Sequence, residues 1–398
     1  MAGSDILFAL LIGAICLLLW ETGRHRQNIA RIPIRIHVNG TRGKSSITRL
    51  IAAGLRESGM TVCAKTTGTL PFMICPDGSE YPVFRPRGAN VIEQVRIMAF
   101  TALCNADALV IECMAVHPQL QWLCEEKFVQ ATHGVITNVR ADHLDVMGPA
   151  EIDVAAALAG TTPTKGTLFV GGGKYIPLFE KAAADRETSL VVIGPENDAA
   201  VTDEEIGGFS YLEHKSNVAM ALRVCSELGV DRATALSGMW KATPDAGAMT
   251  IQSIRFFGRR LYFANGFSAN DPESTEYLWE IASKRCPDVK TRIMIVNCRS
   301  DRPQRSEQLG GACVNWGTVD HFLLIGGGLY FFARKAIEAG VPVRKIIYGD
   351  GRPDAEIFEM ILEMSGASAL VMGIGNIKGQ GLTLSRYFRN RAFLKETV

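Results

Sequence analysis

The sequence predicts a mostly parallel α/β protein of two domains, the first built on a phosphate loop, preceded by one transmembrane helix. Three observations lead to this fold class. Short β-rich apolar runs alternate with longer helical patterns along most of the chain, as in βαβ units. A loop with two glycines and a lysine follows the first of these runs. An uncharged apolar stretch lies within the first twenty residues.

The composition is typical of a packed protein and excludes several other classes. The chain has 398 residues, of which 47% are hydrophobic and 21% charged, so extensive disorder is excluded. The formal net charge of +1 gives no overall field that would hold nucleic acid, and no nucleic-acid partner is expected. The ten cysteines include no CxxC pair, which argues for free thiols in a reducing cytosol.

Residues 1–30 are predicted to form a membrane anchor. Residues 6–20 carry no charge, and Arg24, Arg26 and Arg31 follow closely. As a helix, such a stretch spans about 22 Å of a hydrocarbon core of roughly 30 Å. A buried core helix and a cleaved signal peptide are the alternatives, but the stretch is apolar on every face and no positive residue precedes it. The basic residues after it predict a single-pass protein of the cell membrane with a cytoplasmic body.

The rest of the chain divides into two alternating series. The first predicts strands at 34–39, 61–65, 108–113, 134–138, 167–171 and 190–193, and helices at 45–58, 91–103, 118–126 and 152–159. The pattern breaks at 243–249, a turn that contains proline and glycine. The second series predicts strands near 260–264, 292–297, 321–325, 345–348 and 369–374, with helices between them. We therefore expect a central domain over 31–245 and a smaller Rossmann-like domain over 246–398, with the site in their cleft.

The loop after the first strand is predicted to bind the phosphates of a nucleotide, which makes the first domain a P-loop ATPase domain. The loop and the start of the next helix read Gly40, Thr41, Arg42, Gly43, Lys44, Ser45 and Ser46. Glycines let backbone N–H groups turn toward an anion, and the helix N-terminus adds its positive end. Lys44 can reach the β- and γ-phosphates, and the Ser45 hydroxyl can bind Mg²⁺. The alternative is a capping turn that carries a lysine by chance.

Acidic residues and a histidine follow two further strands. Glu112 lies near the end of the 108–113 strand, and Asp142 and His143 lie just past the 134–138 strand. Ligands of open α/β sheets bind at the carboxyl ends of the strands, where these side chains are expected to meet the phosphate loop. Asp and His side chains can bind a divalent ion that phosphates also hold. Taken alone, Glu112 is equally consistent with a solvated strand end.

Hydroxyl and cationic side chains elsewhere are candidates for contact with a phosphate or a substrate carboxylate. Lys65, Thr66 and Thr67 lie at the end of the 61–65 strand and favour such a role. Arg85 and Arg87 lie in a segment whose alternative is a flexible, solvated loop.

Together these motifs resemble the Mur ligase superfamily of ATP-dependent amide ligases. The matching segments are residues 40–46, Glu112 after its strand, and residues 137–145. By the same resemblance, Asn217 corresponds to an asparagine that contacts the nucleotide. Asp271 corresponds to an aspartate of the C-terminal domain that approaches ATP.

Within that superfamily the chain is similar to the CapB/PgsB family of capsular poly-γ-glutamate synthetase subunits. The similarity rests on the N-terminal anchor and on segments 65–69, 112–116, 142–149, 245–249, 297–302 and 373–377. Cell-wall Mur ligases begin with a domain for a UDP-linked precursor, which the thirty residues before the first strand do not provide. Those enzymes also carry a lysine that becomes carbamylated, and residues 152–160 contain no lysine.

The resemblance implies an ATP- and Mg²⁺-dependent ligase that joins glutamates through their side-chain carboxylates. The γ-phosphate of ATP passes to a carboxylate, and a glutamate amine then attacks the acyl phosphate, so that ADP and phosphate are released. Lys44, Asp142 and His143 are the implied catalytic residues, with Asp142 as the candidate base. Ser45 and Glu112 are implied for one Mg²⁺ and His143 for a second.

The implied partners are glutamate, the growing poly-γ-glutamate chain and the integral membrane subunits of a capsule synthase and export complex, similar to CapC/PgsC and CapA/PgsA. A homo-oligomer is also expected. Arg299 and Arg302, with Arg85 and Arg87, are candidates for binding the polyanion. One alternative is a folylpolyglutamate synthetase-like ligase, although a soluble folate needs no membrane anchor. The other is a non-catalytic, membrane-tethered nucleotide sensor.

Overall fold

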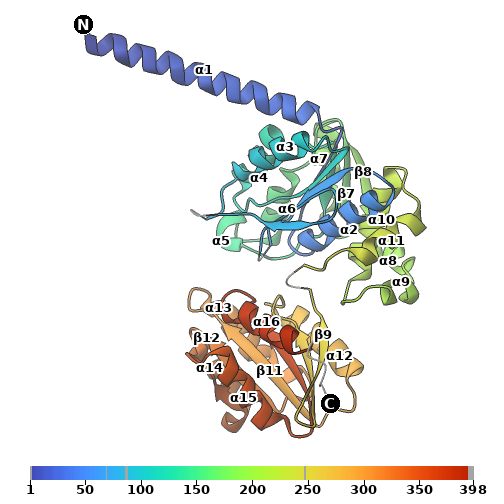
Figure 1. Cartoon of the computed structure of the whole chain (residues 1–398), viewed down its shortest axis with the longest axis vertical. Coiled ribbons are helices and arrows are strands. Elements are labelled where there is room, and N and C mark those ends of the chain that lie inside the picture. Colours follow the sequence, from blue (N-terminus) through green and yellow to red (C-terminus); the bar gives the residue numbers. More distant parts are fainter. Residues whose placement is uncertain (1, 69, 86–87, 246–247, 393–398) are drawn as a thin grey trace. The chain divides into compact units, whose positions relative to one another are not determined.

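The computed structural model of the chain describes residues 2–68, 70–85, 88–245 and 248–392, with side chains from residue 5 onward. It forms two compact units, one made of Met1–Phe209 with His214–Asp245 and the other of Ser210–Glu213 with Ala246–Val398 (Figure 1). Both units are α/β with largely parallel sheets, so the predicted fold class is confirmed.

The first unit is built on an eight-stranded sheet. Its strands are β1 (Ile34–Asn39), β2 (Val62–Lys65), β3 (Phe72–Ile74), β4 (Glu80–Pro82), β5 (Ala108–Glu112), β6 (His133–Ile136), β7 (Thr167–Gly171) and β8 (Ser189–Ile193). The spatial order is β4-β3-β2-β5-β1-β6-β7-β8. Only the pairs β2–β3 and β3–β4 are antiparallel. The strands β2, β5, β1 and β6 are parallel neighbours, so their carboxyl ends lie side by side at one edge.

Helices cover both faces of this sheet (Figure 1). They are α2 (Lys44–Glu57), α3 (Glu93–Leu103), α4 (Pro118–Leu123), a π-helix at Cys124–Val129, α5 (Leu144–Met147), α6 (Glu151–Ala159), α7 (Ile176–Asp185), α8 (Pro195–Ala199), α9 (Asp203–Gly207), α10 (Lys215–Glu227) and α11 (Arg232–Lys241). Every residue of β5 is buried, as expected for a central parallel strand. The α2 helix buries Ile47, Leu50 and Ile51 and packs against α10 and α11.

The hairpin of β3 and β4 and the π-helix are absent from the sequence prediction. Each strand of the hairpin is three residues long, too short for an alternating pattern to be distinguished from a loop. The predicted helix at 118–126 is instead α4 followed by the π-helix, because the chain takes a wider turn from Cys124. The predicted helix at 91–103 begins at Glu93.

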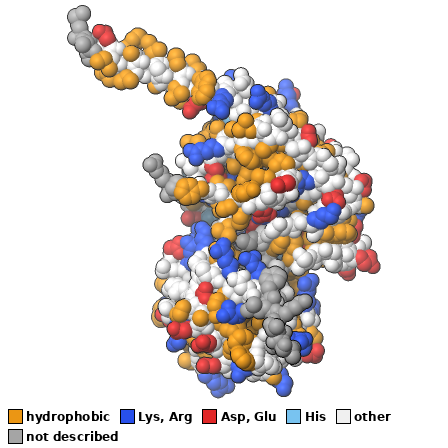
Figure 2. Space-filling view, viewed as in Figure 1, with side chains coloured by type: hydrophobic (Ala, Val, Ile, Leu, Met, Phe, Trp, Pro, Cys, Tyr) orange, Lys and Arg blue, Asp and Glu red, His pale blue; other side chains and the backbone are white. Residues whose placement is uncertain are grey.

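The N-terminal stretch is the helix α1 (Ala2–Ala30), longer than the apolar run alone predicts. By length and composition, Asp5–Ala30 is a candidate membrane span with a mean hydropathy of 2.2 in its most apolar window, and that window is not buried by the rest of the unit. Figure 2 shows hydrophobic side chains along most of this helix. Its last turn is anchored: Ile29 is buried in a core that it shares with Ile97 and Met98 of α3.

The second unit has a six-stranded sheet with the order β13-β12-β11-β14-β10-β9, in which only the β9–β10 pair is antiparallel. Its elements are β9 (Ile251–Phe256), β10 (Arg259–Asn265), α12 (Pro272–Arg285), β11 (Thr291–Cys298), α13 (Pro303–Ala312), β12 (His321–Gly326), α14 (Leu329–Glu338), β13 (Ile346–Tyr348), α15 (Asp354–Ser365), β14 (Ser368–Ile374) and α16 (Gln380–Ala392), with short 3₁₀ turns at Cys313–Asn315 and Val343–Lys345. Alternate residues of β11 enter two cores: Met294 and Val296 pack on one face of the sheet, Ile293 and Ile295 on the other. Helices therefore cover both faces here too.

Candidate active site

The phosphate loop follows β1 at the carboxyl edge of the first sheet, and its glycines are needed for its shape. Gly40 and Gly43 have φ of +128° and +80°, in the region that L side chains rarely adopt. A Cβ on Gly40 would lie 2.0 Å from Thr137 Oγ1, and a Cβ on Gly43 would lie 2.8 Å from Asn217 Oδ1. The loop therefore packs directly against the segment after β6 and against α10. Asn217 lies beside the loop that it was predicted to assist.

Thr137 and Asn138, which follow β6, hold this loop in place through hydrogen bonds. The Asn138 backbone carbonyl accepts a hydrogen bond from Thr41 N at 3.1 Å, and its side-chain Oδ1 accepts from Thr41 Oγ1 at 2.6 Å and from Arg42 N at 3.1 Å. Thr137 Oγ1 donates to the Arg42 carbonyl at 2.6 Å. These bonds fix the loop before any ligand arrives, which preorganises its N–H groups.

The Asn39 side chain holds the start of the phosphate loop, and the sequence prediction did not identify this residue. Its Oδ1 accepts a hydrogen bond from Gly40 N at 2.9 Å, and its Nδ2 donates to Gln121 Oε1 at 2.8 Å and to Thr161 Oγ1 at 3.2 Å. The side chain is buried, with 3% of its surface exposed. A polar residue at the last position of the strand, directly before the phosphate loop, is the signal that could have identified it.

Ser45 and Glu112 meet at the start of α2. Ser45 Oγ donates to Glu112 Oε2 at 2.8 Å, and Thr67 N donates to the same oxygen at 2.6 Å. Glu112 is 2% exposed, so it is not the solvated strand end of the alternative interpretation. The position of a Cβ on Gly68 lies 2.8 Å from Ser45 Oγ and 3.8 Å from Asp245 Oδ2, which brings a second carboxylate to this corner.

The donor atoms at this corner suit a magnesium ion. Hydroxyl and carboxylate oxygens are the ligands that Mg²⁺ prefers, and it is usually held by one or two carboxylates together with phosphates. Among the residues that the structure describes, no group of three or more His, Cys, Asp or Glu side chains forms a ready-made metal site. The Ser45 hydroxyl and the Glu112 carboxylate are the groups at this corner that could hold Mg²⁺ beside nucleotide phosphates.

Lys44 lies across the loop that precedes it. Its Nζ donates to the carbonyl of Gly40 at 2.5 Å and to that of Thr41 at 3.3 Å. A lysine held against the loop in this way can reach phosphates that the backbone N–H groups of the loop bind.

Asp142 and His143 follow β6 at the same edge of the sheet. His143 has φ of +50° and is the N-cap residue of α5, and its carbonyl accepts hydrogen bonds from Val146 N and Met147 N, both at 2.9 Å. Asp142 Oδ1 accepts from His143 N at 3.1 Å and lies 4.0 Å from His143 Nε2. A left-handed backbone at a histidine is uncommon and costs about 1–3 kcal/mol, a strain often found at functional sites.

Lys65 and Arg85, both predicted to contact substrate, lie against one carboxylate in the structure. The Lys65 side chain is completely buried, and its Nζ lies 2.7 Å from Glu93 Oε1. Arg85 binds the same carboxylate through Nε at 2.6 Å and Nη2 at 2.8 Å. Burial lowers the pKa of Lys65, an effect that the nearby Glu93 charge opposes. Both cations thus share the single carboxylate of Glu93, a residue that the sequence prediction did not identify.

The other predicted substrate contacts also have local roles. Thr66 is buried and its Oγ1 accepts a hydrogen bond from Phe72 N at 3.3 Å, which holds the start of β3. Thr67 acts through its backbone on Glu112. Arg87 lies outside the described residues.

The remaining predicted site residues belong to the second unit. Asp271 caps α12, and its Oδ1 accepts a hydrogen bond from Ser274 N at 2.9 Å. Arg299 binds Asp301 through both Nε and Nη2, at 2.8 and 2.5 Å. Arg302 lies at the N-terminus of α13 and donates its backbone N–H to the Arg299 carbonyl at 3.2 Å. Asp271 follows β10 and the arginines follow β11, both at the carboxyl ends of those strands.

Comparison with known proteins identifies the family. The Mur ligase middle domain matches residues 38–226, and the poly-gamma-glutamate synthase CapB C-terminal domain matches residues 251–391. The PGA synthase CapB of Bacillus subtilis (strain 168) is 36% identical over 361 residues, which cover 90% of this chain and 91% of that protein. The chain belongs to the CapB family. The capsule biosynthesis protein CapB of Bacillus anthracis is 35% identical over 363 residues, covering 91% of this CapB-family chain and 77% of that protein.

Solved structures share the fold of this CapB-family chain at low sequence identity. E. coli FolC in complex with DHPP and ADP has a TM-score of 0.65 at 16% identity, covering 93% of each chain. The UDP-N-acetylmuramoylalanyl-D-glutamyl-2,6-diaminopimelate--D-alanyl-D-alanyl ligase of Acinetobacter baumannii has a TM-score of 0.65 at 15% identity, covering 93% of this chain and 78% of that one. The predicted Mur ligase-like fold is therefore confirmed.

Proposed function

We propose that this chain is an ATP-dependent amide ligase that polymerises glutamate into poly-γ-glutamate through an acyl phosphate. The observation that carries the proposal is the Ser45–Glu112 hydrogen bond beside a glycine-shaped phosphate loop, in a chain of the CapB family. The phosphate loop and Glu112 account for the phosphoryl-transfer chemistry, and membership of the CapB family indicates the substrate.

In this proposal the first unit binds ATP. The N–H groups of residues 40–46 and the N-terminus of α2 surround the phosphates, and Lys44 exchanges its two carbonyl acceptors for phosphate oxygens. Ser45 and Glu112 would hold Mg²⁺, which would neutralise phosphate charge there. Asn217 contacts the nucleotide from α10, and Asp271 remains a candidate for contact with ATP from its resemblance to the family motif. His143 remains our candidate for a second Mg²⁺.

The reaction has two balanced steps. A glutamate side-chain carboxylate attacks the γ-phosphorus of ATP, the bond to the β-phosphate oxygen breaks, and ADP leaves. The amine of the next glutamate then attacks the acyl carbon, the bond to phosphate breaks, and the amine proton passes to a base, for which Asp142 is the candidate. The protein contributes positioning and charge neutralisation more than covalent chemistry.

The polyanionic product requires cations that are accessible. Because Lys65 and Arg85 both contact Glu93, we assign them a structural role. Lys65 ends the strand that leads to Thr67, whose backbone N–H binds Glu112. Arg299 and Arg302 remain candidates for contact with polymer carboxylates, since they follow β11 at the carboxyl edge of the second sheet. Arg87 stays a candidate on sequence alone.

The helix α1 suits synthesis at a membrane. We propose that it is a single-pass anchor with the two units in the cytoplasm, in a complex with integral membrane subunits of the CapC/PgsC and CapA/PgsA kind that export the polymer. A homo-oligomer is part of the same proposal. Cross-linking in membranes, followed by mass analysis of the complex, tests both the partners and the stoichiometry.

The experiment that tests the proposed function measures ATP turnover by the full chain in its membrane complex, with glutamate and Mg²⁺ and with no folate present. Glutamate-dependent release of phosphate is expected. The Lys44→Ala variant should lose it, whereas the matched Lys181→Ala variant, changed at an exposed lysine of α7, should retain it. A requirement for folate would favour the folylpolyglutamate synthetase-like alternative, which the FolC fold makes the natural rival. Polymer made by Lys44→Ala would contradict the ligase assignment.

A further inference from the structure

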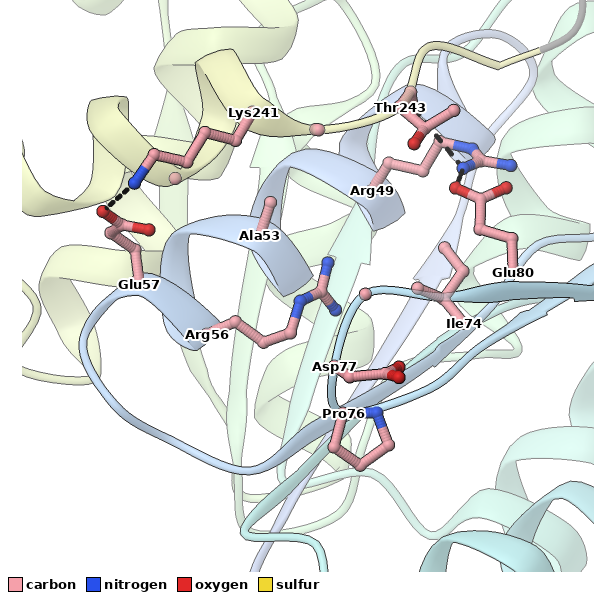
Figure 3. Close-up of a pocket in the computed structure, with 13 residues that line it drawn as sticks. Arg49, Ala53, Arg56, Glu57, Ile74, Pro76, Asp77, Glu80, Lys241 and Thr243 are labelled. Carbon is pink, nitrogen blue, oxygen red and sulfur yellow. Dashed lines mark hydrogen bonds and ion pairs between the residues drawn. The ribbon is translucent and has the colours of Figure 1, made fainter.

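A pocket of about 280 Å³ lies in the first unit beside the C-terminal half of α2 (Figure 3). One wall is a face of α2, since Arg49, Ala53 and Arg56 recur at helical spacing. The other walls are the turn of the β3–β4 hairpin and the segment Lys241–Thr243 at the end of α11. Neither Ser45 nor Glu112 lines it, so it is separate from the proposed ATP site.

The walls carry three cations and three carboxylates, and all the carboxylates are engaged. Arg49 binds Glu80 and also the Thr243 carbonyl at 3.4 Å. Lys241 binds Glu57. The Asp77 carboxylate holds its own turn by accepting hydrogen bonds from Ser79 N at 2.9 Å and Ser79 Oγ at 2.6 Å.

Arg56 is the remaining charged residue among those that line the pocket. Within the described ranges its guanidinium has no ion pair and no hydrogen bond, and its Nη1 is shielded from water without an acceptor. Burial lowers the pKa of Arg56, and the more distant Glu80 charge only partly opposes this. Figure 3 shows the guanidinium reaching from α2 toward the hairpin that carries Asp77 and Ile74. A buried N–H without an acceptor is costly, and a ligand with an oxyanion would satisfy it.

We propose that this pocket binds the α-carboxylate of a γ-linked glutamate unit and so retains the product chain near the site where it grows. The inference rests on the proposed function for the identity of the polymer. A carboxylate matches the planar donor fork of Arg56. The amide N–H beside each α-carboxylate can donate to the remaining lone pairs of Asp77 or Glu57. Inorganic phosphate and free glutamate have no amide N–H beside a carboxylate, and the three wall carboxylates also disfavour the concentrated charge of phosphate.

The position along α2 fits a product site. Arg56 lies three turns beyond Ser45 on the same helix, which is about 16 Å along its axis. Units that were added earlier can therefore occupy the pocket while the newest carboxylate is at the phosphate loop. A chain held at both places stays bound between additions.

The test measures binding of a fluorescent γ-linked glutamate pentamer to the full chain in detergent, without ATP. The Arg56→Gln variant should bind the pentamer at least about tenfold more weakly, since a charge-assisted hydrogen bond is lost. The matched Arg223→Gln variant, changed at a partly exposed arginine of α10 paired with Glu227, should bind like the wild type. Affinity for an ATP analogue should be unchanged in both variants.

Three further measurements keep the outcome clear. Because Arg56 forms no hydrogen bond or ion pair with the residues that the structure describes, Arg56→Gln should leave the melting temperature unchanged or higher, whereas a structural role would lower it. Arg56→Lys, which keeps the charge but not the fork, should recover part of the affinity. Equal pentamer affinity in Arg56→Gln and the wild type would overturn the proposal, as would competition by free glutamate or inorganic phosphate at concentrations similar to the pentamer. Polymer synthesis by the membrane complex is assayed separately, so failure of the pocket and failure of the proposed function remain distinguishable.

Discussion

At the residue scale, the account depends on Glu112 as the carboxylate that meets Ser45. Glu112→Gln keeps the size of the side chain and can still accept hydrogen bonds from Ser45 and Thr67. It removes the charge that Mg²⁺ needs, so glutamate-dependent ATP turnover should fall by at least about 100-fold, with a higher Mg²⁺ requirement. Titration of activity against Mg²⁺ checks this. Glu227→Gln on the surface of α10 is the control, and equal activity in the two variants would refute the role of Glu112.

Substitution of Gly43 tests whether the shape of the phosphate loop, and not only backbone strain, controls ATP affinity. Gly43→Ala introduces a Cβ 2.8 Å from Asn217 Oδ1 at φ +80°, so the loop or Asn217 must move and ATP affinity should fall by at least about tenfold. The control is Gly59→Ala, which has φ +94° and open space around its Cβ. Both variants should lose about 1–2 kcal/mol of stability from the left-handed backbone. Only Gly43→Ala should lose affinity in a titration with an ATP analogue; an equal loss in Gly59→Ala would contradict the contact with Asn217.

Local motifs at this scale were predictable, and their distant partners were not. The glycines, Lys44 and Ser45 are adjacent in the sequence, and Glu112 ends a recognisable strand. Lys65 also ends a strand, yet its partner Glu93 is 28 residues further along and reaches it only in the folded unit. Asn39 and Asn138 act through contacts of the same kind, which no spacing in the sequence reveals.

At the scale of elements, Glu93 joins α3 to the end of β2. Burial opposes its charge, but hydrogen bonds with Arg85 and Lys65 lower the pKa of Glu93 below its ordinary value of 4.5. A lowered folded pKa means that the carboxylate stabilises the protein above pH 4.5 and that this contribution is lost as the pH falls through the folded pKa. Glu93→Gln leaves the buried Lys65 charge unpaired and should cost about 3–5 kcal/mol at pH 7.

Chemical denaturation at several pH values measures this effect. The difference in unfolding free energy between the wild type and Glu93→Gln should stay constant from neutral pH down to about 4.5 and shrink below it. The exposed Glu196→Gln variant should differ little from the wild type throughout. If the difference in unfolding free energy between the two proteins grew as the pH fell, the ion pairs of Glu93 with Lys65 and Arg85 would be contradicted.

The π-helix shows why some elements could not be predicted. It brings Glu125 to His37 of β1, with Oε2 at 2.7 Å from His37 Nδ1, and the other oxygen accepts from Ala131 N at 2.8 Å. Burial opposes charging of His37, but hydrogen bonds with Cys113 and Glu125 raise the pKa of His37 to about 10. This buried network stabilises the wider turn, whereas the sequence pattern of Cys124–Val129 is that of an ordinary helix. Long parallel strands were predictable because their burial leaves continuous apolar runs.

At the scale of the whole molecule, α1 separates membrane attachment from the fold of the first unit. Removing residues 2–20 deletes the apolar stretch but keeps Ile29 and Ile32, which are buried in the core with α3. The truncated chain, expressed without other subunits, should move from the membrane pellet to the supernatant. Its melting temperature and its affinity for an ATP analogue should match those of the full chain in detergent. A truncated chain that still requires detergent would contradict the anchor.

The two-unit α/β organisation followed from the alternation of strands and helices and from the break at 243–249. The strands β3, β4 and β9 did not, because they are short or join a sheet edge in the antiparallel direction. Residues 210–213 belong to the second unit. This placement also depends on a contact between residues distant in the sequence, the hydrogen bond from Leu212 N to the Met249 carbonyl at 2.9 Å.

The most direct test of the central claim is product analysis of the purified membrane complex given ATP, Mg²⁺ and labelled glutamate. We expect labelled poly-γ-glutamate with ADP and phosphate as by-products, because an acyl phosphate receives the γ-phosphate. Release of AMP and pyrophosphate would exclude that intermediate. ATP hydrolysis at full rate with no labelled polymer would show that the phosphate loop serves a purpose other than forming amide bonds.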